Sequence, residues 1–361
     1  MLRRPSTVRF LLGIGIAAIV ASACGSSPST STGSTDVGQG SLTGAGATFP
    51  GPFYTKAFAD YSARYPQVTV NYQAVGSGAG IQQFIKKTVD FGASDVPMGS
   101  GDITSAGGAD ALTQIPTTLG VISIAFNVSG VNDVNLDADT LAGIFLGQIK
   151  KWNDPKLTAL NSGATLPNKS ITVVHRSDGS GTTFHFTDYL SKVSATWKTS
   201  VGNAKSVKWP TGVGASGNTG VAQAIQSTDG AVGYVELAYV VQNSMHQAAL
   251  KNANGKFVKA SVDGATAAAG TNTSVSPTNF SITNAACDAC YPIAGFSWVM
   301  LYTSYSDTPK GKAVVNLFKW LVTDGQSDST DLQYAPLPSA VQQLALSNLK
   351  TIKAGGSTVL S

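Results

Sequence analysis

The chain has 361 residues, of which 12% are charged and 42% are hydrophobic. This balance excludes an intrinsically disordered chain, and 39 glycines without a three-residue period exclude a collagen. The formal net charge of +4 is too small for a dedicated nucleic-acid-binding protein. Residues 1–23 hold three of the positive charges and no acid, so the remainder carries 21 positive and 20 negative charges. We therefore expect no nucleic-acid partner.

The first 23 residues are predicted to be an export signal. Three arginines precede an uncharged run from Phe10 to Ala21, which is too short to span a bilayer. Small residues then lead into Cys24, and this resembles a bacterial lipoprotein signal in which the cysteine becomes the lipidated first residue. An ordinary cleavable signal with an incidental cysteine is the alternative. We expect an exported protein with a palmitate-type anchor at Cys24, held at the cell membrane and facing the periplasm or the cell exterior.

A low-complexity segment follows the cysteine. Among residues 25–40, 13 of 16 are Ser, Thr, Gly or Pro. Such a composition buries no core and behaves as a flexible linker. We therefore assign residues 24–40 to a tether and place the start of the folded part near Ser41. The length that remains is that of about two domains.

Apolar residues at helical spacing and short alternating or β-branched runs then follow one another along the chain. In chain order, the sequence predicts a helix over 54–65 that Pro66 ends, a strand over 68–72, a helix over 81–89, strands over 121–126 and 171–174, and helices over 186–193 and 314–321. Helices that alternate with short strands are typical of the α/β class.

Three glycine-rich loops precede predicted helices. They cover residues 44–50, 76–80 and 176–182, and the last contains Arg176. Each presents hydroxyls and backbone N–H groups at a helix start, which suits a tetrahedral oxyanion. Plain helix caps and turns are the alternative for any single loop. None of the loops fits a nucleotide P-loop or a dinucleotide fingerprint.

These loops and several further motifs resemble the PstS family, the phosphate-binding proteins of bacterial phosphate ABC transporters. The resemblance runs from about Ser41 to the C-terminus. It implies a type II periplasmic-binding-protein fold, with two α/β lobes joined by a two-stranded hinge and the ligand in the cleft. Lobe one would comprise residues 41–127 and 291–361, and lobe two residues 128–290. The motifs that carry the resemblance are residues 41–50, 89–95, 146–152, 176–184, 207–210 and 232–236.

The resemblance also implies a ligand set. Asp95 would accept the proton of a phosphate P–OH group, and Asp178 would pair with the arginine. Because sulfate lacks that proton near neutral pH, a site built around the bond would reject sulfate on the order of 10⁴-fold. The remaining donors would be Thr48, Phe49 through its backbone N–H, and Ser77 from lobe one, and Arg176, Ser180, Gly181 and Thr182 from lobe two.

The function that the resemblance implies is high-affinity phosphate binding outside the cytoplasmic membrane and delivery to an ABC-type permease with its cytoplasmic ATPase. We expect a monomer. Two alternatives are a surface lipoprotein with a structural or sensing role and a carrier of another oxyanion. An enzyme would need an activated nucleophile or metal ligands. His175 and His185 adjoin the third loop but form no recognisable triad, so we expect no enzyme, no cofactor and no metal.

Apart from Cys24, the chain has two cysteines, Cys287 and Cys290. In an exported protein such a pair favours a disulfide. A redox-active C-x-x-C would need a thioredoxin-like context, and a zinc site would need four ligands. The resemblance places the pair beside the second lobe crossing, near Tyr291, where a disulfide would stiffen the hinge.

Overall fold

The computed structural model describes residues 36–360. The chain divides into two compact units, Met1–Asp36 and Val37–Ser361. The predicted signal, Cys24 and tether residues 25–35 lie outside the described residues. The second unit includes the last residues of the predicted tether, because the apolar side chain of Val37 is buried in the core.

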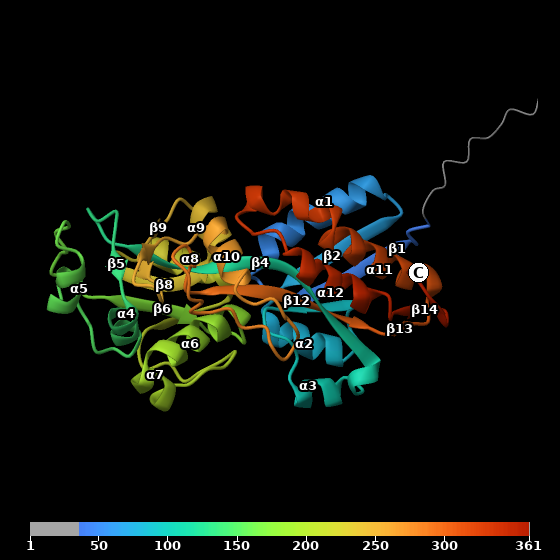
Figure 1. Cartoon of the computed structure of the whole chain (residues 1–361), viewed down its shortest axis with the longest axis horizontal. Helices are drawn as coiled ribbons and strands as arrows, with labels where there is room; N and C mark the ends of the chain where they lie inside the picture. The colour runs from blue at the N-terminus through green and yellow to red at the C-terminus, as the bar shows by residue number, and fades with distance from the viewer. Residues whose placement is uncertain (1–35, 361) are drawn as a thin grey trace, which may run out of the picture. The chain divides into compact units, whose positions relative to one another are not determined.

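A mixed nine-stranded sheet forms the centre of the second unit (Figure 1). At one end of the sheet β2, β1 and β3 run parallel, and at the other end β8, β6 and β7 do so. Two antiparallel strands, β12 and β4, separate these groups. In sheet order the strands are β2 (Val68–Ala74), β1 (Gly40–Gly46), β3 (Phe91–Ser94), β12 (Ala294–Tyr302), β4 (Leu112–Asn127), β8 (Ala231–Glu236), β6 (Thr172–Arg176) and β7 (Val213–Ala215), with β9 (His246–Gln247) also pairing β4.

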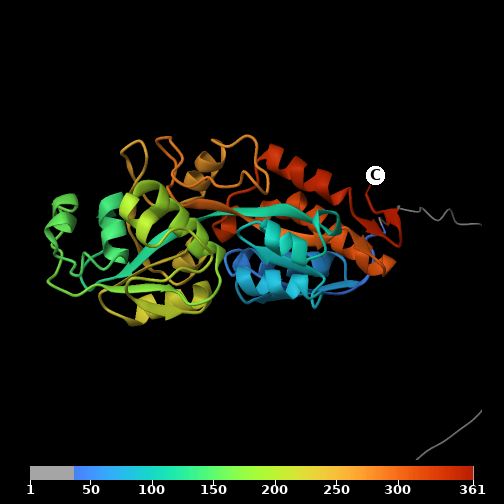
Figure 2. The ribbon, with the colours of Figure 1, turned by 90° about the horizontal axis from the view of Figure 1, so that it is seen from below.

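The 16-residue strand β4 belongs to both ends of the sheet. Its first part pairs with β12 and its last part, from Ile122, pairs with β8. Figure 2 shows β4 and β12 running from one half of the unit into the other. The change of partner at Val121–Ile122 comes a few residues before Asn127, where we expected the chain to cross between lobes. The lobe boundaries themselves stay a prediction.

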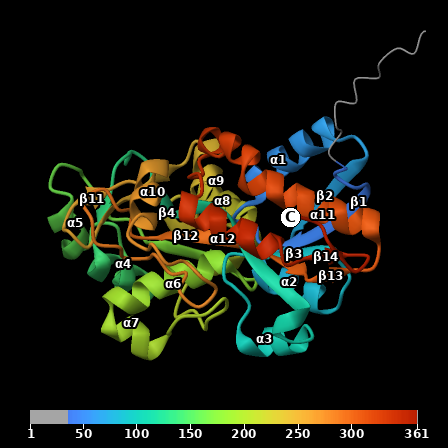
Figure 3. The same ribbon diagram turned by 45° about the vertical axis from the view of Figure 1, so that its right-hand side comes forward.

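Helices cover both faces of the sheet. In Figure 3, α12 lies over β12 and β4, beside α11. The helices are α1 (Gly51–Arg64), α2 (Ser77–Ile85), α3 (Ser100–Ser105), α4 (Ala138–Phe145), α5 (Pro155–Leu160), α6 (Gly181–Val193), α7 (Ala195–Ser200), α8 (Gly217–Ser227), α9 (Leu237–Gln242), α10 (Val262–Ala269), α11 (Thr308–Val322) and α12 (Ser339–Leu349). The described residues also form two small three-stranded sheets. One consists of β11 (Phe257–Val258), β10 (Ala249–Lys251) and β5 (Asn135–Leu136), and the other of β13 (Ser304–Tyr305), β14 (Lys353–Ala354) and β15 (Ser357–Thr358). Short 3₁₀ turns span Ala109–Ala111, Asp324–Asp328 and Thr330–Leu332.

The predicted elements are present, with differences at their ends. The first predicted helix is α1, which ends at Arg64 because Pro66 follows closely. The second is α2, which ends at Ile85 rather than at Val89, because Lys87 adopts a left-handed conformation (φ 56°). The strand predicted over 121–126 is the last part of the longer β4, whose Pro116 and Gly120 obscured the pattern. No helix among the described residues is long and apolar enough to cross a membrane.

Candidate functional site

The three glycine-rich loops meet in the middle of the sheet because of where its parallel strands end. Thr48 follows β1, Ser77 follows β2 and Asp95 follows β3. Arg176 is the last residue of β6, which belongs to the parallel group at the other end. Carboxyl ends of parallel strands are the usual place for ligands in α/β sheets. Hydrogen bonds that join the loops, described below, bring all three to one place.

Thr48, Ser77 and Thr182 each accept hydrogen bonds from N–H groups of the protein. The Thr48 hydroxyl accepts from the backbone N–H (3.2 Å) and the side-chain amide (2.9 Å) of Asn218. Ser77 Oγ accepts from the N–H of Gly181 (3.1 Å) and of Asp95 (3.3 Å). Thr182 Oγ1 accepts from Arg176 Nη1 (3.3 Å) and Asn218 Nδ2 (3.2 Å). A hydroxyl carries one proton and two lone pairs, so each of these hydroxyls also has a proton to donate. The proton of Ser77 is directed at Asp95 Oδ2 over a long contact of 3.4 Å.

Arg176 is oriented by Asp178. Its Nε donates to Asp178 Oδ1 (2.7 Å) and its Nη2 to Oδ2, a bidentate pair, while the Arg176 side chain is almost fully buried. The backbone N–H of Gly217 also donates to Asp178 Oδ1 (3.1 Å). The arginine and these hydrogen bonds hold the pKa of Asp178 below its ordinary value, although burial acts in the opposite direction. Asp178 therefore stays ionised near neutral pH and fixes the plane of the guanidinium.

Asp95 is a buried acid in a different environment. Its carboxyl is 1% exposed, and burial raises its pKa to about 7, against the hydrogen bond from Ser297 and the charge of Arg176. Its side chain lies against the start of α6, since a Cβ on Gly181 would come within 2.5 Å of Asp95 Oδ2. Only glycine fits at position 181. When both acids are ionised, Asp95, Asp178 and Arg176 carry one positive and two negative charges.

Two further predicted residues lie at helix starts. Ser180 is the N-cap of α6, where its hydroxyl accepts from the N–H of Thr183 (3.1 Å). Phe49 lies between β1 and α1, and its carbonyl accepts from the Tyr334 hydroxyl (2.6 Å). The backbone N–H groups at such helix starts carry partial positive charge. Every predicted side chain of the site (Thr48, Ser77, Asp95, Arg176, Ser180 and Thr182) is at most 6% exposed.

Comparison with known proteins shows the family of the chain. The model of the PBP superfamily domain matches residues 29–324. A relative from Xylella fastidiosa, named phosphate-binding protein PstS, is 43% identical over 82% of this chain and 81% of its own length. A relative of the same name from Pasteurella multocida is 44% identical over 86% of this chain and 90% of its own. The chain belongs to the PstS family.

Solved structures show the same fold. A periplasmic phosphate-binding protein bound with phosphate (PfluDING) superposes with a TM-score of 0.67 at 23% identity, over 85% of this chain and 93% of its own. A phosphate-binding protein from Stenotrophomonas maltophilia gives 0.65 at 21% identity, over the same shares. The type II periplasmic-binding-protein fold that the sequence predicted is thereby confirmed.

One site residue of this PstS chain was not predicted from the sequence. Asn218 is fully buried near the start of α8, and its amide bridges the Thr48 and Thr182 hydroxyls. Its Oδ1 accepts from the N–H of Glu236 (3.0 Å), which fixes the orientation of the amide. A signal was present, because residues 214–220 (GASGNTG) form a fourth glycine-rich loop before a helix.

Two histidines and two cysteines of this PstS chain make contacts that stabilise the fold. His185 is buried on α6, and its Nε2 bonds the Asp95 carbonyl (2.9 Å). His175 stacks on Trp209. Cys287 and Cys290 form a disulfide, and the Asn252 amide donates to both cysteine carbonyls. No group of three or more metal-ligating side chains occurs within residues 36–360.

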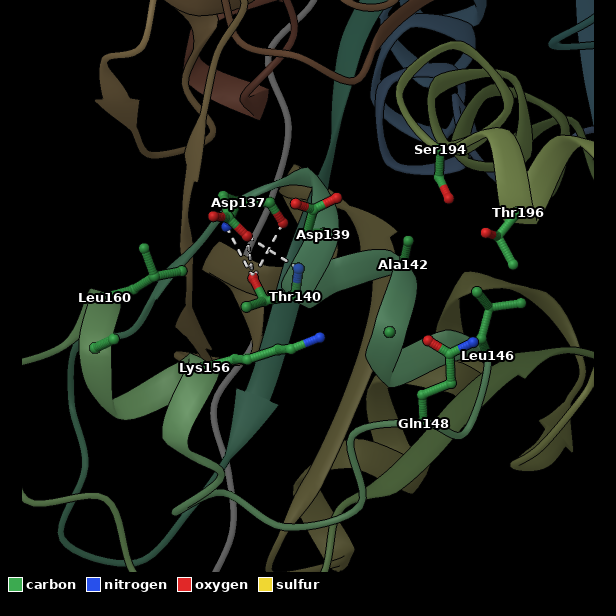
Figure 4. A pocket seen from close by; sticks show the side chains of 12 residues that line it. Asp137, Asp139, Thr140, Ala142, Leu146, Gln148, Lys156, Leu160, Ser194 and Thr196 are labelled. Carbon is green, nitrogen blue, oxygen red and sulfur yellow. Dashed lines mark hydrogen bonds between the residues drawn. The ribbon is translucent and has the colours of Figure 1, made fainter.

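A separate surface pocket of about 590 Å³ lies among α4, α5 and the start of α7 (Figure 4). Asp137, Asp139, Gln148 and Lys156 contribute to its lining. Asp137 and Thr140 satisfy each other there as a capping box at the start of α4. None of the predicted ligand residues lines this pocket.

Proposed function

We propose that the protein binds inorganic phosphate outside the cytoplasmic membrane and delivers it to an ABC-type phosphate permease. Relatives at 43–44% identity over most of the chain carry the name phosphate-binding protein PstS, which supports this function. The proposed ligands are Thr48, Phe49, Ser77, Asp95, Arg176, Ser180, Gly181 and Thr182.

The observation that carries the proposal is the set of hydroxyls whose oxygens already accept from N–H groups. Thr48 and Thr182 each present a remaining proton in a buried site. The buried Ser77 hydroxyl donates to Asp95 over a long contact, and we expect an anion to take this proton. Such hydroxyls act as donors to an anion. Arg176 adds charge-assisted hydrogen bonds from nitrogens of a guanidinium that Asp178 already orients. Because the ionised side chains of the site carry no net positive charge, neutral donors and helix N-termini supply much of the binding.

Asp95 gives the proposed site its selectivity. A phosphate that keeps a proton near neutral pH has a P–OH group to donate to the Asp95 carboxylate, whereas sulfate has none. Sulfate would place its charge against an ionised acid with no hydrogen bond in return. Since the pKa of Asp95 is about 7, protonation below that pH removes the repulsion and lets the carboxyl donate to sulfate. Rejection of sulfate is therefore expected to weaken as the pH falls below about 7.

The site takes ligand residues from both predicted lobes, so the anion favours the closed arrangement of the two. The closed form is what the permease would recognise. We further propose that Cys24 carries the lipid anchor at the cell membrane, that the protein is a monomer, and that it is a binding protein rather than an enzyme.

A calorimetric titration tests this function. The full chain, purified in detergent and stripped of bound anion, is titrated with phosphate and with sulfate at several pH values. Tight one-to-one phosphate binding with sulfate silent at pH 8 is expected. Comparable sulfate binding at pH 8 would contradict the role of Asp95. A folded, ligand-free protein that bound neither anion would contradict the phosphate-carrier function and favour a structural surface lipoprotein.

A further inference from the structure

The two carboxyl oxygens of Asp95 have different partners. Oδ1 accepts from the hydroxyl of Ser297 at 2.8 Å. Oδ2 accepts from the hydroxyl of Ser77 at 3.4 Å and faces the start of α6 at Gly181. The first contact is short and the second is long. Oδ1 therefore holds the shorter bond, and Oδ2, whose donor Ser77 is itself a proposed ligand, is the oxygen that can accept from a bound anion.

Ser297 reaches Asp95 through an irregularity in the sheet. The strand β12 pairs with β3 up to Trp298 opposite Ser94, so Ser297 is the next residue toward Asp95. The register between β12 and β4 shifts between Ser297 and Trp298, which leaves Thr117 without an opposite residue. Bulges of this kind redirect side chains and recur beside functional sites.

Hydrogen bonds to the backbone of Ser297 fix the position of this residue. The Thr117 hydroxyl donates to the Ser297 carbonyl (3.2 Å), and the Tyr54 hydroxyl is hydrogen-bonded to Thr117. All three residues are fully buried. The Ser297 hydroxyl is thus held on a rigid element, with Asp95 as its acceptor, and an ionised carboxylate can only accept.

We propose that Ser297 is a specificity-determining positioning residue that keeps Asp95 a hydrogen-bond acceptor with Oδ2 turned toward the ligand. This inference rests on the proposed phosphate function. Ser77 cannot take over the role, because its hydroxyl is a proposed phosphate ligand. When phosphate takes the Ser77 proton, Ser297 is the side-chain donor that remains on Asp95.

Other groups around Asp95 set the background. The positive charge of Arg176 lowers the pKa of Asp95, and the negative charge of Asp178 raises it. Glu236 is also buried near Asp95. Burial, and to a lesser extent the negative charge of Asp95, raises the pKa of Glu236 well above its ordinary value. Burial lowers the pKa of His185, which bonds the Asp95 carbonyl. Four tyrosines interact electrostatically with Asp95, and burial raises the pKa of each. They are Tyr54, Tyr72, Tyr239 and Tyr334.

Ser297→Ala removes the hydroxyl and tests the proposal through the pH dependence of sulfate binding. The loss of one hydrogen bond to a charged group is expected to shift the titration of Asp95 upward by about one pH unit. In competition against phosphate, sulfate should then bind about tenfold more tightly to the variant than to the native full chain at pH 8.5. Below pH 6 the two proteins should differ little, because Asp95 is protonated in both.

Three controls separate positioning from a general effect on the fold. Ser297→Thr keeps the hydroxyl and should restore the native sulfate profile. Ser123→Ala removes a buried serine of β4 that donates to Gln247, and should leave the profile unchanged. In an Asp95→Asn background, Ser297→Ala should have no further effect on sulfate, since the serine acts through Asp95.

A sulfate profile in Ser297→Ala that matches the native one would overturn the inference, as would a full effect in the Asp95→Asn background. If Ser297→Ala does not fold, Ser297→Cys offers a weak donor of similar size, with the same shift expected at reduced amplitude. Native protein that binds no phosphate would instead contradict the proposed function. The two failures are therefore distinguishable.

Discussion

The phosphate site and the pocket among α4, α5 and α7 differ in how their polar side chains are held. The pocket has a volume of about 590 Å³, but Asp139, Gln148 and Lys156 on its lining are exposed to water. In the site, the polar side chains are buried and take partners that are distant in the sequence, such as Ser77 with Gly181. Volume alone therefore does not mark a binding site. Buried donors with fixed orientation are what distinguish one anion from another.

The largest effect should come from Arg176. Arg176→Gln removes the buried cation and leaves Asp178 without its partner, so phosphate affinity is expected to fall about 10³-fold. Arg176→Lys is the matched control, because it keeps the charge but not the bidentate geometry, and should lose less. Calorimetric titration of both variants measures the difference. An affinity within tenfold of native in Arg176→Gln would contradict the proposed ligand role.

Asp95→Asn should change selectivity more than phosphate affinity. The native discrimination against sulfate, on the order of 10⁴-fold, is expected to fall to about 10²-fold or less, since an amide can donate to sulfate. Competition titrations at pH 8 measure this ratio. Retention of native discrimination would show that another group excludes sulfate.

The same variant tests the raised pKa of Asp95 in the absence of ligand. Folding raises that pKa from 3.8 to about 7, so the stabilisation linked to the bound proton is present below 3.8 and lost as the pH rises through 7. In the Asp95→Asn variant the side-chain amide at this position does not titrate. Its melting temperature relative to the native protein should therefore increase from pH 4 to pH 8. A constant difference across that range would mean that Asp95 is not the titrating group.

An intermediate effect is expected for Asn218, whose amide orients two of the hydroxyl ligands. Asn218→Ala should weaken phosphate binding about tenfold, the value of one or two neutral hydrogen bonds. Asn243→Ala is a control outside the site, since that amide donates to the Tyr239 carbonyl of α9 and contacts no proposed ligand hydroxyl among residues 36–360. Equal phosphate affinities in the two variants would remove Asn218 from the site.

The smallest effect on binding should follow changes in the pocket. Asp137→Ala removes the capping box of α4 and is expected to reduce the free energy of unfolding by about 1 kcal/mol. Phosphate affinity should stay within about twofold of native, because no ligand residue contacts this helix start. Chemical denaturation and calorimetry measure the two quantities separately. A large loss of affinity would link the pocket to the site.

The sequence was most informative where local chemistry dictates structure. Pro66 predicted the end of α1, and the glycine-rich loops predicted that helices follow them. The helices α2 and α6 begin earlier than predicted, inside these loops at Ser77 and Gly181. The family resemblance then supplied a role for each ligand residue. Asn218 was missed although it lies in a fourth glycine-rich loop, because that loop does not reveal the contact with Thr48, 170 residues away.

The position of Ser297 was equally hidden from the sequence. Its approach to Asp95 depends on a register shift between β12 and β4, and pairing between distant strands leaves no periodicity in either strand alone. The extent of β4 was underestimated for a related reason. Its Pro116 lies at the register shift between β12 and β4, and a bulge is one of the few places where an internal strand accepts proline. Its Gly120 lies against the Phe49 ring, which leaves little room for a side chain.

The absence of a net positive charge in the site has a consequence for the medium in which the protein works. Arg176 stands against two acids, and the remaining donors are hydroxyls and helix N-termini rather than exposed lysines. Mobile ions screen exposed charges over about 10 Å at 0.1 M salt, but they act weakly on buried dipoles. Phosphate affinity should therefore change little between dilute and saline surroundings. The protein would therefore keep its hold on phosphate when the salinity around it rises or falls.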